Sequence, residues 1–307
     1  MIENIEFVLA CGGQSTRNYP QSKGLAHKGF LPFGSVRLID YILQQIFAVG
    51  GKYITIVCRS EDVKKSFQEA LAPSPEVEQK VEKRGHPKIA QAIRSTRIPE
   101  GVQIRYVIQE QPLGTAHVLA LAHEQSPDRH MALIFPDDVH LPEPGQPLLL
   151  QALADAFLAD PKQILLTTIP CKDVSAYAIV HNNRIIEKPS VAYNLMGVFS
   201  PMFFPKACLD HIVAKWKTYR PEEPFFKGEW FYTDASNDFM DEEGLANGYK
   251  ITTFARPNAL YYMDVGNLPN YEHALLFSLL TMSLYKDEHI QFIKQFLSDL
   301  DKKNESE

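Results

Sequence analysis

The sequence predicts an α/β protein built on a doubly wound, mainly parallel sheet, with a smaller mixed sheet and C-terminal helices. In the first half of the chain, short apolar runs alternate with segments whose apolar residues recur at helical spacing. This alternation is typical of parallel βαβ units. After Ile169 the chain changes to short paired runs, which favour a mixed sheet. In a doubly wound sheet, ligands bind at the C-terminal ends of the strands.

Each element of the first half follows from its local pattern. Five short apolar runs are expected to be strands: Glu6–Cys11, Tyr53–Cys58, Gln103–Ile108, Met131–Phe135 and Gln163–Ile169. The intervening segments with helical spacing are expected to be helices: Leu38–Val49, Asp62–Leu71, Thr115–His123 and Leu148–Leu158. The segment Pro73–Arg97 carries prolines and a charged run at helical spacing, so we expect a solvated helical insertion there.

The second half is expected to supply the mixed sheet and the C-terminal helices. The residues His181-Asn182-Asn183 are typical of a hairpin turn between two short strands. The expected strands of this half are Tyr177–Val180, Arg184–Glu187, Asn194–Phe199 and Tyr249–Phe254. Asn267–Leu300 is expected to form two helices, and the apolar stretch Leu275–Leu284 fits either core packing, which we favour, or an interface in a homo-oligomer.

Composition excludes several classes of protein. Lys and Arg number 31 and Asp and Glu 37, for a formal net charge of −6, which argues against nucleic-acid or anionic-membrane partners. The four cysteines are far apart and form no CxxC pair, so disulfides and a zinc site are not expected. No apolar run reaches the roughly 18 residues of a membrane span, and we expect a soluble, cytoplasmic protein.

A glycine-rich turn follows the first expected strand. Gly12 and Gly13 allow backbone N–H groups to approach a flat base or a phosphate. Arg17, Lys23 and Lys28 follow within a short distance, and three cations can neutralise a triphosphate. A glycine pair after a strand is more often only a tight turn. The added cations favour a nucleoside triphosphate site.

Carboxylates follow two other expected strands. Asp137 and Asp138 come directly after an apolar run, and Asp264 follows Tyr262-Met263. One or two carboxylates together with substrate phosphates are the usual ligands of Mg²⁺. The alternative interpretations are a turn cap for the aspartate pair and a helix N-cap for Asp264.

Two further motifs have polar groups suited to a base and a sugar. The loop Gln109–His117 joins a strand to a helix, and Gln109 offers the donor and acceptor that a base edge requires. Its alternative is a plain connecting loop. Glu187 and Lys188 follow another strand, where such a pair is usually a surface ion pair. They could also accept sugar hydroxyl protons and meet a phosphate.

Together, in this order, these motifs resemble the nucleotide-sugar pyrophosphorylases, most closely the bacterial UTP–glucose-1-phosphate uridylyltransferases. The resemblance covers roughly residues 5–285. The family signature begins with GxGTR, Lys-Pro or Lys-Glu, LPx and PLI(D/Q)Y, and the matching residues here are GQSTR, Lys28-Gly29, Leu31-Pro32 and Leu38-Ile39-Asp40-Tyr41. The uridylyltransferase branch adds a helical insertion, a QxQxxGxGHA loop and LPDDV, matched here by Pro73–Arg97, QEQPLGTAH and FPDDV. The motifs EKP, TDA and DxG complete the match.

The resemblance implies a Rossmann-like nucleotidyltransferase fold, a role for each matched residue, and Mg²⁺ as cofactor. Arg17 and Lys28 would be catalytic, and Asp137 and Asp264 would bind Mg²⁺. The nucleotide ligands would be Gly12, Gly13, Gln109, Gly114 and Asp137, and the sugar-phosphate ligands would be Glu187, Lys188 and Asn194. One nucleotidyltransferase domain would occupy 1–285, with an insertion at about 73–97 and a sugar-binding subregion at about 170–265, followed by a helix and frayed tail over 286–307.

The expected reaction joins a nucleoside triphosphate and a sugar-1-phosphate, with UTP and glucose-1-phosphate as the preferred pair. The alternatives are dTTP, CTP or another sugar-1-phosphate, and a non-catalytic nucleotide-sugar-binding paralogue. The chain departs from the family pattern at three matched positions. Ser15 replaces a glycine, Gly29 replaces a proline or glutamate, and Ala178 stands where glycine is frequent. One residue is inserted near Gly24. These departures bear on substrate choice and on activity.

Overall fold

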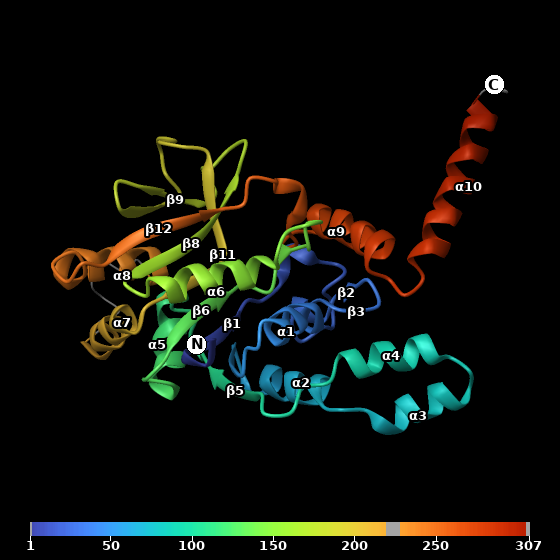
Figure 1. The fold of residues 1–307 in the computed structure, drawn as a ribbon, viewed down its shortest axis with the longest axis horizontal. Helices are drawn as coiled ribbons and strands as arrows, with labels where there is room; N and C mark the ends of the chain where they lie inside the picture. Colours follow the sequence, from blue (N-terminus) through green and yellow to red (C-terminus); the bar gives the residue numbers. More distant parts are fainter. Residues whose placement is uncertain (1, 219–227, 305–307) are drawn as a thin grey trace.

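A computed structural model describes residues 2–218 and 228–304. Within these residues, nine strands form one sheet whose main path runs β10-β9-β11-β6-β1-β4-β5, with β8 beside β11 and β12 beside β8 (Figure 1). The central strands are parallel and agree with the predicted fold class. They are β1 (Ile5–Cys11), β4 (Tyr53–Cys58), β5 (Gln103–Ile108) and β6 (His130–Ile134).

The mixed part of the sheet is continuous with the parallel part through β11 (Met196–Phe204), which pairs antiparallel with β6, β8 and β9. The predicted strand ends at Phe199, but the apolar run resumes after a register shift between Phe199 and Met202. Asn182 and Asn183 have φ of 48° and 58°, as the predicted hairpin turn requires. The other strands are β8 (Gln163–Pro170), β9 (Ala178–His181), β10 (Arg184–Glu187) and β12 (Lys250–Ala255).

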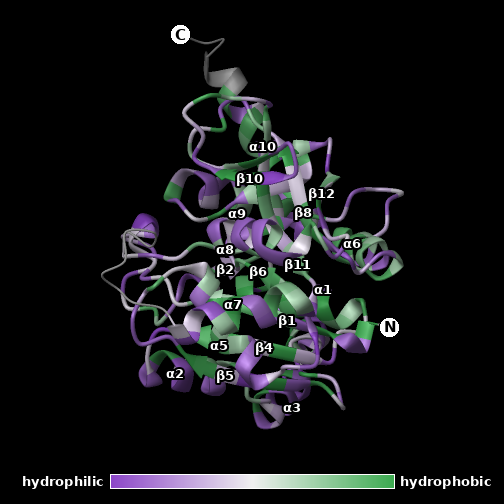
Figure 2. Ribbon diagram, turned by 90° about the vertical axis from the view of Figure 1, so that its left-hand side faces the viewer, coloured by the Kyte–Doolittle hydropathy of each residue, from purple (hydrophilic) through white to green (hydrophobic). Residues whose placement is uncertain are grey.

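Helices cover both faces of the sheet because β1 is apolar on both. Phe7 and Leu9 pack with the helices of one face and Val8 packs with those of the other. Hydrophobic residues accordingly run through the central strands, whereas α2 carries much hydrophilic surface (Figure 2). The first face has α1 (Leu38–Ala48), α2 (Glu61–Leu71) and α6 (Leu149–Ala159), and the second has α5 (Thr115–Gln125), α7 (Lys206–Thr218) and α8 (Tyr232–Phe239).

Residues 75–95 form two helices at the edge of the molecule, α3 (Pro75–Lys83) and α4 (Pro87–Ser95) (Figure 1). The buried Glu78 joins them through Arg94, whose Nη1 lies 2.9 Å from Glu78 Oε1. The helical character predicted for this segment is therefore present. A cavity lies between this pair of helices and the start of α1 and the end of α2.

The C-terminal segment forms the two predicted helices, α9 (Leu268–Thr281) and α10 (Lys286–Asn304). In α9, Tyr271 and Ala274 are buried in the core and Leu275 packs against it, whereas α10 projects away from the body (Figure 1). In the described part of the chain, no helix has the length and apolarity to span a membrane. The remaining elements are β2 (Pro32–Phe33), β3 (Val36–Arg37), β7 (Asp138–His140), β13 (Tyr262–Asp264), the π-helical turn Met240–Gly244, and the 3₁₀ turns Ile2–Asn4, η2 (Thr16–Asn18), η3 (Lys28–Phe30) and Ala259–Tyr261.

Candidate active site

A cleft of about 450 Å³ opens where β1 and β6 end. Most of the predicted site residues line it, from both halves of the chain: Gly12, Gly13, Arg17, Lys28, Gln109, Gly114, Asp137, Glu187 and Asp264. A larger cavity, of about 560 Å³, lies between the start of α1 and α3–α4, and none of its described lining residues is a predicted site residue. The chemistry of the lining, and not cavity size, therefore identifies the candidate site.

A short antiparallel ribbon brings the carboxylates of the two halves together. Strand β7 begins at Asp138 and pairs with β13, so that Asp138 lies opposite Asp264. The Val265 N–H also donates to the carbonyl oxygen of Asp137 at 2.8 Å. These backbone contacts place Asp137 and Asp264 on the same cleft wall, although neither lies at the end of a long strand.

The two carboxylates converge on Gly266. A Cβ atom at this position would lie 2.6 Å from Asp137 Oδ2, 2.8 Å from Asp264 Oδ1 and 3.3 Å from Arg17 Nη2, so only glycine fits without displacing them. The Asn18 side chain donates to Val265 O at 2.9 Å and ties the turn that carries Arg17 to this point. Carboxylate oxygens that converge in this way match the preference of Mg²⁺ for hard ligands.

The described residues offer no group of three or more His, Cys, Asp or Glu side chains that could hold a metal ion. The chain by itself presents two carboxylates. Mg²⁺ usually completes its coordination with water and substrate phosphates, which would supply the remaining ligands here.

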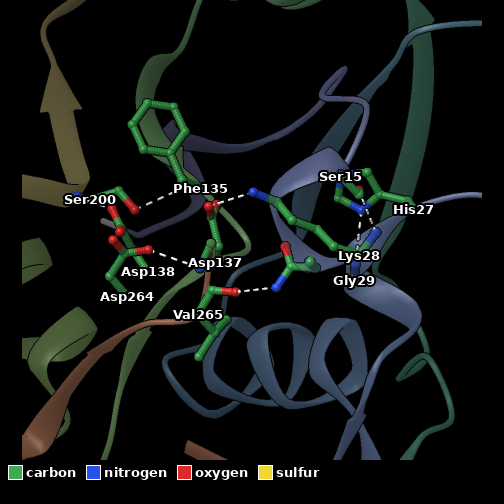
Figure 3. A network of polar contacts seen from close by, with 12 residues as sticks. Ser15, His27, Lys28, Gly29, Phe135, Asp137, Asp138, Ser200, Asp264 and Val265 are labelled. Atoms are coloured by element: carbon green, nitrogen blue, oxygen red, sulfur yellow. Dashed lines mark hydrogen bonds and ion pairs between the residues drawn. The ribbon is translucent and has the colours of Figure 1, made fainter. Parts of the chain in front are cut away.

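Lys28 is the charged partner of Asp137, and its Nζ contacts Asp137 Oδ2 (Figure 3). Burial raises the pKa of Asp137, but the charge and hydrogen bond of Lys28 outweigh it and hold the pKa below its usual value. Burial, together with the charge of Asp137, raises the pKa of Asp264. Asp137 is therefore held as an anion, and Asp264 would gain from a nearby cation.

Asp138 also lines the cleft and has its own partners. Its Oδ2 accepts the Ser200 N–H at 2.8 Å, and its Oδ1 accepts the Tyr262 hydroxyl at 2.9 Å. Burial and the negative charge of Asp137 raise the pKa of Asp138 to about 7. Its hydrogen bonds fix β7 against β11 and β13, which positions the adjacent Asp137.

The Gln109 side chain has one defined orientation. Its Nε2 donates to Gly114 O at 3.0 Å and lies 3.2 Å from His117 Nδ1. Burial lowers the pKa of His117 to about 4, so the neutral ring can accept at Nδ1. The Gln109 Oε1 atom lies against Gly12, where a Cβ would approach it to 2.9 Å. Gly12 therefore makes room for Gln109, which presents an acceptor at the cleft wall.

Gly114 has a second reason to be glycine. Its φ of 93° and ψ of −179° fall in a region that only glycine adopts freely. A Cβ there would lie 2.3 Å from Trp230 O, because the Trp230 backbone bonds both Leu113 O (2.8 Å) and the Ala116 N–H (3.0 Å). Gly114 was assigned to the nucleotide site in the sequence analysis. The structure shows that glycine is also needed there because the Trp230 backbone packs against it.

Of the three predicted sugar-phosphate ligands, one lines the cleft and two do not. Glu187 ends β10 and lines the cleft, and burial raises its pKa. Lys188 has φ of 44° and its N–H donates to Tyr177 O. The Asn194 side chain donates to Val180 O and accepts the Met196 N–H, both at 2.9 Å. Neither Lys188 nor Asn194 lines the cleft, and both stay predictions as substrate ligands.

An aromatic wall of the cleft was not predicted from sequence. Phe199 lies between Tyr177 and Tyr262, with ring centroids 4.8 Å and 4.5 Å apart, and all three rings line the cleft. A signal existed for Tyr262, because it lies two residues before Asp264 and a strand places such residues on one face. Tyr177 and Phe199 come from strand regions whose pairing the sequence does not reveal.

Comparisons with known proteins identify the family of the chain. Residues 6–279 match the family model described as "Nucleotidyl transferase". A UTP–glucose-1-phosphate uridylyltransferase from Salmonella typhimurium is 26% identical over 186 residues, which cover 60% of this chain and 61% of that protein. The match thus spans about three fifths of the relative's length.

Two solved structures share the fold. A UDP-glucose pyrophosphorylase from Acinetobacter baumanii superposes with a TM-score of 0.75 at 22% identity, covering 96% of this chain and 100% of that one. A putative glucose-1-phosphate thymidylyltransferase from Bacillus anthracis gives a TM-score of 0.65 at 16% identity, covering 90% and 95%. At these identities the likeness concerns the fold, which supports the predicted fold class.

Proposed function

Because the chain belongs to the nucleotidyl transferase family, we propose that it joins a nucleoside triphosphate and a sugar-1-phosphate to give an NDP-sugar and pyrophosphate. UTP and glucose-1-phosphate are the pair that we favour. The observation that carries this proposal is the convergence of Asp137 and Asp264 on Gly266, beside Arg17 and Lys28, in one cleft.

The proposed reaction needs charge neutralisation more than proton transfer. A phosphate oxygen of the sugar-1-phosphate attacks the α-phosphorus, the bond from that phosphorus to the bridging oxygen breaks, and pyrophosphate leaves with the electron pair. The attacking oxygen is already anionic, so no general base is required. Positioning and electrostatic stabilisation then supply most of the rate. A cleft with a lysine, an arginine and two carboxylates suits that chemistry.

Each charged residue has a proposed role. Lys28 and Arg17 would neutralise the phosphates, Lys28 at the reacting α-phosphate. Asp137 and Asp264 would hold Mg²⁺, and their convergence on a glycine fits such an ion. When bound, the metal would neutralise phosphate charge as the pyrophosphate leaves. The contact between Lys28 and Asp137 keeps the lysine extended into the cleft until a phosphate competes for it.

The orientation of Gln109 favours a uracil or thymine base. Its Nε2 is engaged by Gly114 O and His117, so Oε1 is the atom left for a ligand. Uracil and thymine carry an N3–H donor, whereas the N3 of cytosine is an acceptor. Cytosine would place an acceptor against an acceptor and leave it unpaired, which costs free energy in a desolvated site. We therefore favour UTP or dTTP over CTP.

The sugar side rests on fewer contacts. Glu187 lines the cleft and would accept hydrogen bonds from sugar hydroxyls. Tyr177, Phe199 and Tyr262 line the cleft, and these aromatic side chains would contact the apolar face of a hexose. These groups suit glucose-1-phosphate, and other hexose phosphates stay as alternatives. The match to the uridylyltransferase from Salmonella typhimurium supports glucose as the first choice.

A non-catalytic paralogue that binds nucleotide-sugars is the alternative from another class. Such a protein could lose its metal ligands and still fold. This chain retains Lys28, Asp137, Arg17 and Asp264 in contact or close approach, which favours the enzyme.

The test is pyrophosphate release with UTP, dTTP, CTP and ATP, each paired with a panel of sugar-1-phosphates and Mg²⁺. We expect the highest kcat/KM with UTP and glucose-1-phosphate, and CTP to be poorer than dTTP. Nucleotide binding is measured in parallel by calorimetry. Binding without turnover for every pair would reject the enzyme in favour of the binding protein, and preferred use of CTP would reject the role given to Gln109.

A further inference from the structure

The backbone around Lys28 is held by the side chains of two residues. The Lys28 N–H donates to Ser15 Oγ at 2.9 Å, and the next N–H, of Gly29, donates to His27 Nδ1 at 3.0 Å (Figure 3). Both N–H groups lie in the first turn of η3, where no helical carbonyl can accept them. Lys28 thus extends toward Asp137 from a turn fixed at two consecutive peptide groups.

Ser15 adopts a conformation that a serine rarely takes. Its φ of 59° and ψ of 24° are left-handed, which costs roughly 1–2 kcal/mol for a residue with a Cβ. The Ser22 hydroxyl donates to Ser15 O at 2.8 Å and helps to hold this conformation. Glycine would fit the backbone better, but it has no hydroxyl to accept the Lys28 N–H. A serine that keeps a strained conformation beside a site suggests a function for its side chain.

His27 is fully buried, and its ring packs 5.6 Å from that of Phe67. Burial and the charge of Lys28 lower its pKa to about 3, so Nδ1 stays an acceptor at ordinary pH. The ring also limits position 29, where a Cβ would lie 3.1 Å from Nδ1. Gly29 leaves room for His27, and His27 in turn restrains a flexible glycine.

We propose that Ser15 and His27 are positioning residues, which together fix the backbone of Lys28 so that its ammonium group meets the reacting phosphate. We call the two hydrogen bonds from the Lys28 and Gly29 N–H groups to Ser15 and His27 the clamp. The proposal rests on the function proposed above, because the clamp holds the lysine that acts in that reaction. Ser15 and Gly29 are two of the positions where this sequence departs from the motif it resembles. In this chain Ser15 accepts the Lys28 N–H and Gly29 leaves room for His27, so both departures belong to the same clamp.

A matched pair at position 27 separates the acceptor from the aromatic packing. His27→Asn keeps an acceptor that can reach the N–H two residues on, as in an Asx turn, but loses the ring. His27→Phe keeps a ring against Phe67 and loses the acceptor. We expect His27→Phe to lower kcat about 10- to 100-fold with little change in KM, since small misplacement of a catalytic group costs that much. His27→Asn should stay within about 3-fold of wild type.

Ser15→Gly is the second test, because it relieves backbone strain and removes the hydroxyl together with the Cβ atom. We expect unchanged or higher thermal stability together with a loss of kcat of about 10-fold. If His27→Phe does not fold, Ser15→Gly decides the question alone. Wild-type kcat in Ser15→Gly, or equal losses in His27→Asn and His27→Phe, would overturn the clamp.

Amide hydrogen exchange at Lys28 and Gly29 keeps this proposal distinct from the proposed function. Exchange should be faster at Lys28 in Ser15→Gly and at Gly29 in His27→Phe than in wild type, whether or not the protein turns over. No turnover by the wild-type protein would reject the proposed function. Unchanged exchange in both variants would reject the clamp.

Discussion

The two ends of strand β1 both lie beside buried carboxylates but hold them in opposite ways. At the N-terminal end, the fully buried Glu6 accepts hydrogen bonds from the hydroxyls of Thr55 (2.6 Å) and Ser126 (2.9 Å). The Nη1 atoms of Arg105 and Arg129 lie 3.6 Å and 4.0 Å from its Oε2. All of these partners belong to the folded chain itself.

At the C-terminal end, the carboxylates are only partly satisfied by the chain. Asp137 has Lys28 as its charged partner, and the raised pKa of Asp264 reflects burial and the nearby charge of Asp137. Both line an open cleft. The difference teaches that burial alone does not mark a functional carboxylate. A carboxylate whose hydrogen-bond and charge partners all lie inside the protein stabilises the fold. A carboxylate that lines an open cleft can also bind a ligand.

Removal of the metal should produce the largest effect. Because we propose that Asp137 and Asp264 hold a catalytic Mg²⁺, excess EDTA should remove that ion. Pyrophosphate release should then fall by about 10³-fold or more, equal to several kcal/mol of transition-state stabilisation. Urea unfolding without nucleotide should not change, since the fold does not require the ion. Readdition of Mg²⁺ is the control, and turnover that resists EDTA would remove the metal from the account.

Glu6→Gln changes the carboxylate at the N-terminal end of β1. It should lower stability and leave activity unchanged, the opposite of metal removal. The substitution keeps the shape and removes the charge beside Arg105 and Arg129. We expect the free energy of unfolding to fall by about 3 kcal/mol, as for a broken buried ion pair, while kcat and KM of the folded enzyme stay within about 2-fold. Urea denaturation and pyrophosphate release measure the two quantities. Lost activity with intact stability would break the comparison.

Gly114→Ala and Gly101→Ala form a matched pair that measures how tightly the loop beside Gln109 packs. Both glycines have positive φ, of 93° and 81°, but a Cβ at Gly101 meets open space whereas one at Gly114 meets Trp230. We expect Gly114→Ala to lose about 2 kcal/mol more stability than Gly101→Ala. Equal losses in urea denaturation would show that backbone strain alone explains the glycine at 114.

His140→Gln should give the smallest effect, seen in the pH dependence of stability. Burial lowers the pKa of His140 to about 3, so below about pH 6.5 the unfolded chain binds a proton that the folded chain does not. This group therefore makes wild type less stable as pH falls, by about 1.4 kcal/mol per pH unit. Glutamine can keep the donation to Ser200 O without titrating. Urea denaturation at pH 6 and pH 5 should show a shallower slope in the variant, and parallel slopes would refute the buried neutral ring.

The long apolar elements could be predicted from sequence because their patterns are unambiguous. Strand β4 agrees with its prediction at both ends, since an uninterrupted apolar run there has no competing helical period. The pairing of β7 with β13 could not be predicted, because three residues carry too little pattern. Helices α7 and α8 were not predicted either. In α7, apolar residues recur at helical spacing, a signal that the sequence analysis missed: Leu209, Ile212, Val213 and Trp216. The eight residues of α8 mix aromatic and polar types without such a period.

Within the candidate site, sequence indicated which residues gather but not what each one contacts. Asp137 and Asp264 were grouped by motif, yet only the fold shows that Gly266 leaves the space between them. Asn194 was expected near a substrate, but its amide bonds the backbone of β9 and β11. Local side-chain-to-backbone bonds of this kind depend on tertiary pairing, which the sequence does not display.

The most direct test of the central claim is the activity of Asp137→Asn with UTP, glucose-1-phosphate and Mg²⁺. The side chain keeps its size, but it loses the charge that Lys28 contacts and that we propose binds the metal. We predict that pyrophosphate release falls about 10³-fold while the variant keeps a cooperative unfolding transition in urea. Wild-type turnover by this variant would contradict the account of the cleft.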